Sequence, residues 1–174
     1  ILYGLYIGLT MICFLFLFLG GMPLFDSVCI TFGTAGTGGF GIRADSMASY
    51  SAYCQIVVTV FMALFGVNFN IFFLMILRRF RLALEDEELR VYLGIFLGSI
   101  LLVGVNIAGM FDRISEAVPH AAFTVSSLIT TTGYATVGFD QWPQVARRLL
   151  LMLMVFGGCA GSPGGRVTVR LLSP

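Results

Sequence analysis

Residues 130–138 read TTTGYATVG, and residues 34–41 read TAGTGGFG. Each run contains a threonine, one further residue, a glycine and an aromatic residue in that order. Glycine tolerates backbone angles that other residues avoid, and such angles can turn consecutive carbonyl oxygens toward one side of the chain. Carbonyls arranged in this way, together with threonine hydroxyls, can replace the water around an alkali cation. Either run alone would also fit an ordinary external turn, because glycine and threonine are common in turns.

A short apolar segment precedes each run. These segments are Phe25–Phe32 (FDSVCITF) and Ala121–Ile129 (AAFTVSSLI). Each is shorter than the roughly 20 residues that a helix needs to cross the hydrocarbon core, so each suits a re-entrant helix. The carboxyl end of such a helix carries partial negative charge and favours a cation nearby. Because non-helical backbone at membrane depth must be surrounded by protein or line water, the loops that follow are predicted to be functional.

The two runs are parts of a longer repeat. When Gly39 is aligned with Gly133, the apolar stretches on both sides of the two runs also coincide. Two matched loops of this kind, each after a short helix, favour pore loops over turns. We therefore predict an all-α membrane protein with pore repeats at residues 1–77 and 91–174, joined by a charged cytoplasmic linker at residues 78–90. The alignment also pairs Thr37 with Thr131, Phe40 with Tyr134, Phe25 with Pro119 and Asp26 with His120. The aromatic residue after each loop glycine is predicted to pack behind its loop and to hold the shape of the loop.

The composition is typical of a chain embedded in lipid. Hydrophobic residues make up 58% of the sequence and charged residues 11%, which is too little charge for a soluble domain. Four apolar stretches, at residues 1–19, 53–77, 91–111 and from 149 onward, are predicted to span the membrane. The arginines of the linker favour the cytoplasm, which puts both loops outside, although the adjacent Arg147 and Arg148 then also lie outside. The net charge of +1 gives no reason to expect a nucleic-acid partner.

The sequence offers little for catalysis or for a metal centre. It has four scattered cysteines and one histidine, His120, so no cofactor is expected in this chain. It has no Ser/His/Asp set and no phosphate-binding glycine loop, so an enzyme is not expected. A secondary transporter with a substrate site at unwound helices is the main alternative, and it would use ionisable residues within the membrane. Asp26 and His120 alone are available for that role, and a structural scaffold would need no matched loops.

A third unusual segment interrupts the last apolar stretch, where Gly157–Gly165 reads GGCAGSPGG. Glycine costs a helix about 1 kcal/mol and proline about 3 kcal/mol relative to alanine, so a stable helix cannot continue through this segment. An unwound stretch within the membrane could form a movable constriction below the loops. The alternative is that the helix ends at Gly157 and that the glycines form a loop on the far side.

At these three segments the sequence resembles the Trk/Ktr/HKT superfamily of potassium and sodium translocating subunits, and most closely its bacterial TrkH-type members. The resemblance covers nearly the whole chain and rests on TAGTGGFG at 34–41, TTTGYATVGFDQWP at 130–143 and GGCAGSPGG at 157–165. In that family four repeats surround one pore in a pseudo-fourfold, potassium-channel-like architecture. By this resemblance the chain looks like the second and third repeats of a longer protein. The implied function is potassium uptake across the bacterial inner membrane, with Na⁺ left open as a second ion.

The resemblance also implies roles for individual residues. Gly39 and Gly133 are the expected filter glycines, with K⁺ at the backbone carbonyls of Gly38, Gly39, Thr132 and Gly133. The glycine-rich segment is the expected gate, although Pro163 stands where the family usually has threonine. The implied partners are the lipid bilayer, a second copy in a homodimer and a cytoplasmic nucleotide-binding ring protein on the inner face. The full candidate sets are Thr37, Gly38, Gly39, Phe40, Thr131, Thr132, Gly133 and Tyr134 for the filter, and Gly157, Gly158, Gly161, Ser162, Gly164 and Gly165 for the gate.

Overall fold

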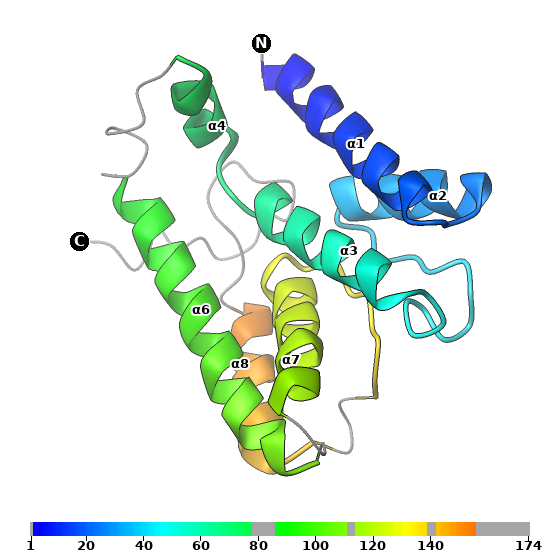
Figure 1. Cartoon of the computed structure of the whole chain (residues 1–174). Coiled ribbons are helices and arrows are strands. Elements are labelled where there is room, and N and C mark those ends of the chain that lie inside the picture. The colour runs from blue at the N-terminus through cyan, green and yellow to red at the C-terminus, as the bar shows by residue number, and fades with distance from the viewer. Residues whose placement is uncertain (1, 78–85, 111–113, 139–141, 156–174) are drawn as a thin grey trace.

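The computed structural model describes residues 2–77, 86–110, 114–138 and 142–155, and every regular element in these ranges is a helix (Figure 1). The all-helical class predicted from the sequence is therefore confirmed. The helices are α1 (Leu2–Leu19), α2 (Leu24–Ala35), α3 (Ala52–Phe65), α4 (Phe69–Ile76), α6 (Glu87–Ile107), α7 (Ile114–Ile129) and α8 (Gln144–Val155), with a 3₁₀ turn at Ala108–Met110.

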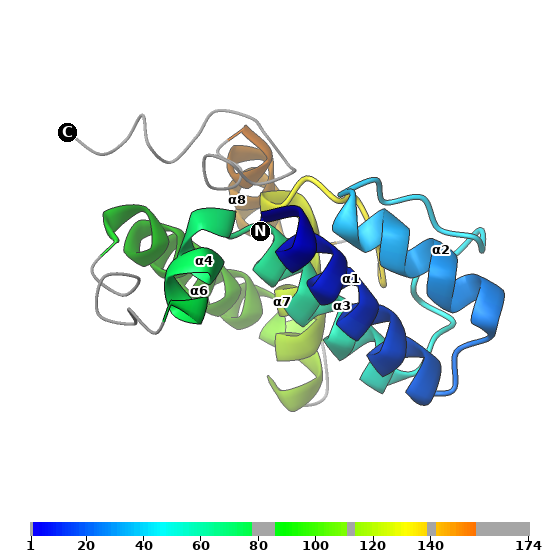
Figure 2. The ribbon, with the colours of Figure 1, turned by 90° about the horizontal axis from the view of Figure 1, so that it is seen from above.

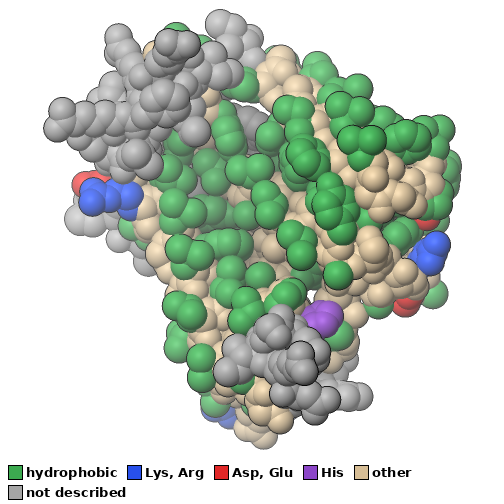
Figure 3. Space-filling model, viewed as in Figure 1, with side chains coloured by type: hydrophobic (Ala, Val, Ile, Leu, Met, Phe, Trp, Pro, Cys, Tyr) green, Lys and Arg blue, Asp and Glu red, His purple; other side chains and the backbone are tan. Residues whose placement is uncertain are grey.

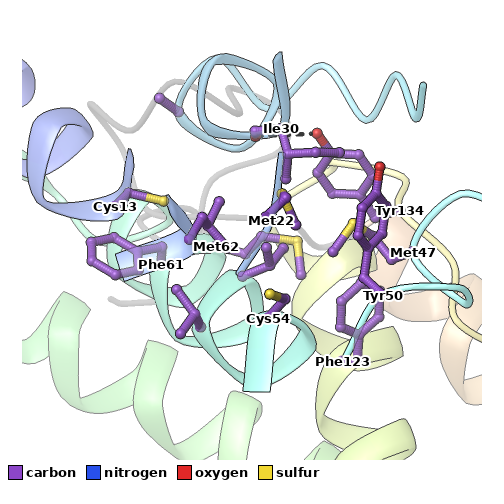
Figure 4. Packing of buried hydrophobic residues seen from close by; sticks show 14 of the residues in the cluster. Cys13, Met22, Ile30, Met47, Tyr50, Cys54, Phe61, Met62, Phe123 and Tyr134 are labelled. Atoms are coloured by element: carbon purple, nitrogen blue, oxygen red, sulfur yellow. Dashed lines mark hydrogen bonds between the residues drawn. The ribbon is translucent and has the colours of Figure 1, made fainter. Parts of the chain in front are cut away.

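Helix α7 lies at the centre of the bundle and packs against α3, α6 and α8 (Figures 1 and 2). In the first half of the chain, α1 packs against α2, α3 and α4. Buried side chains form one cluster around α6, α7 and α8 and a second around α1, α2 and α3. Phe123 and Tyr134 belong to the second cluster although they come from the second half of the chain (Figure 4). The two halves therefore share a core.

Polar side chains join the helices of this core. The Ser126 hydroxyl of α7 donates to the Thr59 carbonyl of α3 at 3.0 Å. The Tyr92 hydroxyl of α6 donates to the Ala63 carbonyl at 3.1 Å. Such bonds between helices replace the hydrogen bonds that water would supply outside a membrane.

The second predicted span is not one helix. The sequence predicted a helix over residues 53–77, but α3 ends at Phe65 and α4 starts at Phe69. A Cβ on Gly66 would lie 2.5 Å from the Tyr92 hydroxyl and 2.8 Å from the Thr130 methyl group, so the backbone approaches its neighbours closely here. The prediction of a single helix is wrong, because glycine lowers helix stability at the point where α6 and α7 crowd the chain.

Two other elements begin earlier than predicted. Helix α7 begins at Ile114 rather than near Ala121, and Pro119 lies inside it. His120 is consequently an interior residue of the helix, not its first. Helix α6 begins within the predicted linker, where the Asp86 carboxylate accepts the Leu89 N–H at 3.1 Å and caps the helix. The linker residues 78–85 lie outside the described ranges.

Apolar side chains cover much of the outer surface. The face seen in Figure 3 is largely hydrophobic, with the described charged residues at its edges. Helix α6 presents Leu93, Leu97, Leu101 and Val105 at steps of four residues, and Val105 is 75% exposed. Among the described residues, Leu89–Ile107 is the one segment long and apolar enough to cross a membrane, and only 28% of it is buried. A helix of about 20 residues has the length of the hydrocarbon core, so this exposed stripe fits contact with lipid.

Candidate functional site

The two candidate loops start in the same way. Helix α2 ends at Ala35 and α7 ends at Ile129, and these residues are equivalent in the alignment of Gly39 with Gly133. Three backbone hydrogen bonds then recur at equivalent positions of the two loops. In the first loop the N–H groups of Gly36, Thr37 and Gly38 donate to the carbonyls of Phe32 (2.8 Å), Thr34 (3.3 Å) and Gly33 (2.8 Å). In the second loop the N–H groups of Thr130, Thr131 and Thr132 donate to the carbonyls of Ser126 (3.1 Å), Leu128 (3.1 Å) and Ser127 (2.9 Å).

The backbone angles of the two loops also correspond. Thr37 and Thr131 have φ values of 49° and 57°, and Gly39 and Gly133 have φ values of 65° and 91°. A threonine in the left-handed region is uncommon, because its branched side chain crowds the following carbonyl. Two threonines in this conformation at matched positions favour loops whose shape is fixed by the surrounding structure over variable external turns.

The two loops come into contact. A Cβ placed on Gly39 would overlap the carbonyl oxygen of Thr132, so only glycine allows this approach. A Cβ placed on Gly133 would meet nothing within 4 Å. A hollow of about 80 Å³ lies beside this glycine, lined by Ser127, Leu128, Thr131, Gly133 and Met154. One glycine therefore sits between the loops, and the other faces open space.

Tyr134, which follows the second loop glycine, is packed behind the loop as the sequence predicted. Its side chain is 3% exposed, and its hydroxyl donates to the Ile30 carbonyl of α2 at 3.3 Å (Figure 4). Its own carbonyl accepts the Ser127 hydroxyl at 2.7 Å. A Cβ on Gly33 would overlap the tyrosine hydroxyl, so α2 has a glycine where the ring docks. The second loop is thereby fixed to α2 in the first half of the chain.

Phe40, which follows the first loop glycine, does not pack behind its loop. Its side chain is 84% exposed, so the prediction that both aromatics are buried there is wrong for this residue. Tyr134 is covered by α2, the helix that precedes the first loop. The described part of the chain contains no third such helix that would cover Phe40 in the same manner.

Polar residues on α2 and α7 contact the segments that follow the loops. The Asp26 carboxylate of α2 accepts the Tyr50 hydroxyl at 2.8 Å, and the Arg43 guanidinium lies 4.7 Å from the centre of the Tyr50 ring. Burial and the neighbouring Asp26 carboxylate raise the pKa of Tyr50 to about 12. On α7, Nδ1 of His120 lies 3.3 Å from the Thr136 hydroxyl. The pair aligned in the sequence thus makes comparable contacts in both halves.

Sequence reasoning missed a contact between the halves beyond the loops. The Met47 N–H donates to the Ala135 carbonyl at 3.0 Å, and the Ala135 N–H donates to the Ser46 hydroxyl at 3.2 Å. Ser46 has a positive φ of 56°. No motif in the sequence indicated this pairing, because it joins residues that are 89 positions apart.

The candidate gate residues lie outside the described part of the chain. Helix α8 ends at Val155 in the structure, and Gly157–Gly165 follows in the sequence. Within the described ranges, no group of three or more His, Cys, Asp or Glu side chains is arranged to hold a metal ion.

Comparison with known proteins bears on this site. The sequence model of the TrkH family, described as cation transport protein, matches residues 1–168. The chain is 35% identical over 159 residues to the Trk system potassium uptake protein TrkG of Escherichia coli strain K12, covering 88% of this chain and 33% of that protein. It is 30% identical over 172 residues to the Trk system potassium uptake protein TrkH of Salmonella typhimurium strain LT2, covering 97% of this chain and 36% of that protein.

The chain is also similar in structure to a solved member of the family. The potassium transporter TrkH from Vibrio parahaemolyticus superposes with a TM-score of 0.90 at 30% sequence identity, covering 98% of this chain and 38% of that chain. The present chain thus spans about a third of the length of these relatives.

The family match places the chain in the class of membrane cation transport proteins, and the helical fold and the apolar outer surface agree with that class. The chain belongs to the TrkH family of cation transport proteins.

Proposed function

We propose that this chain forms two pore repeats of a potassium-conducting subunit, and that the loops at 37–40 and 131–134 are part of its selectivity filter. The observation that carries the proposal is the matched geometry of the two loops. They follow helices that end at equivalent residues, they have the same pattern of φ angles, and they touch each other at Gly39 and Thr132. The potassium uptake role named for the relatives supports K⁺ as the ion. The repeats would be the second and third of four.

The chemistry follows from the backbone. A K⁺ ion entering the filter gives up water and takes carbonyl oxygens in exchange, from Gly38 and Gly39 in one loop and Thr132 and Gly133 in the other. The C-terminal ends of α2 and α7 point partial negative charge toward the same region, which lowers the electrostatic cost of the dehydrated cation. The open space beside Gly133 fits a position on the ion path.

The rest of the subunit extends this proposal. Gly157, Gly158, Gly161, Ser162, Gly164 and Gly165 would form an intramembrane gate below the filter. The protein would lie in the bacterial inner membrane as a homodimer, with a nucleotide-binding ring protein on its cytoplasmic face. These points rest on the family resemblance, and the apolar outer surface of α6 supports the location in lipid.

Growth of a potassium-uptake-deficient bacterium at low external K⁺ tests the proposal. The full-length protein should restore growth, and Gly133→Arg should abolish the rescue at unchanged membrane abundance, because the new cation would enter the open space beside the loop. Ser49→Arg is the matched control, since it adds the same charge at an exposed position of the 41–50 segment. Rescue that survives Gly133→Arg would contradict the filter assignment and favour a transporter with its site elsewhere.

A further inference from the structure

One turn of the first half of the chain holds the backbone immediately beyond the second loop. Ala135 follows Tyr134, and both of its backbone polar groups are bound by neighbouring residues of that turn. Its N–H donates to the Ser46 hydroxyl at 3.2 Å, and its carbonyl accepts the Met47 N–H at 3.0 Å. Ala135 is therefore held at two points, which fixes its orientation as well as its position.

The turn that makes these contacts is itself rigidly built. The Ser46 N–H donates to the Arg43 carbonyl at 3.0 Å, which closes the turn. The side-chain amide of Gln55, on α3, donates to the Met47 carbonyl at 3.0 Å and to the Tyr50 carbonyl at 3.2 Å. Met47 is fully buried. A continuous set of hydrogen bonds therefore connects α3, through this turn, to the residue that follows the second loop.

The conformation of Ser46 gives its hydroxyl a specific use. The residue has φ of 56°, a region that glycine and asparagine occupy more readily than serine. A Cβ on Gly41 would lie 2.9 Å from the Ser46 Cα, so the loop closes tightly on this residue. A serine in this conformation supplies the side-chain oxygen that accepts the Ala135 N–H, which glycine could not do.

We propose that Ser46 is a positioning residue for the second filter loop, acting through Ala135 on the carbonyls of Thr132 and Gly133. The inference rests on the proposed filter function. Oxygens that bind a dehydrated cation must be held within about 0.5 Å of their working geometry. Ser46 touches no ion and lies outside the loop. It sets the direction in which the chain leaves the loop, and so the spacing of the oxygens that distinguish K⁺ from Na⁺.

The test is the K⁺ over Na⁺ flux ratio of the purified full-length protein in liposomes, with protein abundance measured in the same vesicles. Ser46→Ala removes the acceptor and should lower the ratio by about fivefold, the size expected for one lost hydrogen bond. Ser46→Asn keeps a side-chain oxygen in a residue that tolerates positive φ, and should retain most of the ratio. Ser49→Ala is the matched control in the same segment, because the Ser49 hydroxyl donates only to the nearby exposed Asp45.

Each further outcome is decisive. An unchanged ratio in Ser46→Ala would overturn the inference, as would a ratio restored by Ser46→Gly, which relieves the positive φ but has no hydroxyl. Ser46→Gly also covers a failure of Ser46→Ala to fold, since glycine accepts this φ freely. Reduced abundance with a normal ratio in the remaining protein would show a structural role alone and would equally overturn it. Absence of cation flux from the unaltered protein would instead contradict the proposed function on which the inference depends.

Discussion

The hydroxyl of Tyr134 occupies the space that a side chain on Gly33 would need. The ring comes from the second loop and the glycine from α2, so this contact joins the second loop to the helix that precedes the first loop. Ser127, the residue of α7 equivalent to Gly33, has a hydroxyl there and uses it to hold the Tyr134 carbonyl at 2.7 Å. The two aligned residues thus contact the same tyrosine in different ways: Gly33 leaves room for its hydroxyl, and Ser127 binds its carbonyl.

Gly33→Ala should destabilise the protein because the new methyl group overlaps the Tyr134 hydroxyl. The expected cost is about 1–3 kcal/mol, as for other overpacked sites. Tyr134→Phe removes the overlapping oxygen, and a Cβ at residue 33 would then lie 3.3 Å from the nearest remaining ring carbon. Thermal unfolding of the purified full-length protein should therefore show that the double variant is more stable than Gly33→Ala alone. Additive losses in the double variant would contradict the contact.

The two loop glycines should respond differently to alanine. Gly39→Ala places a methyl group on the Thr132 carbonyl, so the amount of folded protein in the membrane should fall. The alanine methyl of Gly133→Ala meets no atom within 4 Å, so this variant should keep more folded protein in the membrane than Gly39→Ala. Its uptake of Rb⁺, used as a tracer for K⁺, should fall because alanine is strained at a φ of 91°. Gly94→Ala on α6, with nothing within 4 Å and no positive φ, is the control and should change neither quantity. Equal abundance for Gly39→Ala and Gly94→Ala would count against the loop contact.

Alkaline pH should weaken the anchor between Tyr50 and Asp26. Burial and the carboxylate raise the pKa of Tyr50 from 10.0 to about 12, so folding favours the neutral phenol. The stability from this group is complete below about pH 10 and is lost as the pH rises from about 10 to about 12. Tyr50→Phe should reduce the alkaline loss of thermal stability measured from about pH 8 to about pH 11. Parallel losses in the parent and in the variant would show that Tyr50 contributes nothing to it.

The outer stripe of α6 should contact lipid. Leu101 is 67% exposed, whereas Val103, two residues further along the helix, is completely buried. A nitroxide label at Leu101→Cys in liposomes should be reached by dissolved oxygen and not by a water-soluble nickel complex. Val103→Cys should label poorly. The variants are made in a protein whose native cysteines are replaced by alanine. Strong nickel access at residue 101 would contradict contact with lipid.

The loops were the part of the structure most open to prediction from sequence. Thr37 and Thr131 stand at the same place before a glycine and an aromatic residue, and both take the same rare backbone conformation. Local sequence determines this geometry, because the end of a helix and a glycine leave the backbone few alternatives. The alignment pairs Asp26 with His120, and both residues make polar contacts in the structure, although the sequence did not predict their partners.

The failures of prediction concern tertiary contacts. Nothing near Gly66 distinguishes a tolerated helix glycine from a break, since the break depends on Tyr92 and Thr130, which are distant in sequence. Phe40 and Tyr134 occupy equivalent positions in the sequence, yet among the described residues only Tyr134 is covered by the helix that precedes the other loop. The contact of Ser46 with Ala135 has no sequence signature, because neither residue type favours such a pairing.

The bonds from Ser46 to Ala135 and from Tyr134 to Ile30 span 89 and 104 residues. Contacts so far apart are slow to form, because a long loop must close before they contribute. The half that supplies Ser46 and Ile30 is synthesised first, so it can already be folded in the membrane when the second half arrives to pack against it. The second loop takes its backbone conformation from short-range hydrogen bonds, whereas its attachment to the rest of the molecule needs these two contacts with the first half. Order of synthesis thus becomes part of how the two halves of this chain come together.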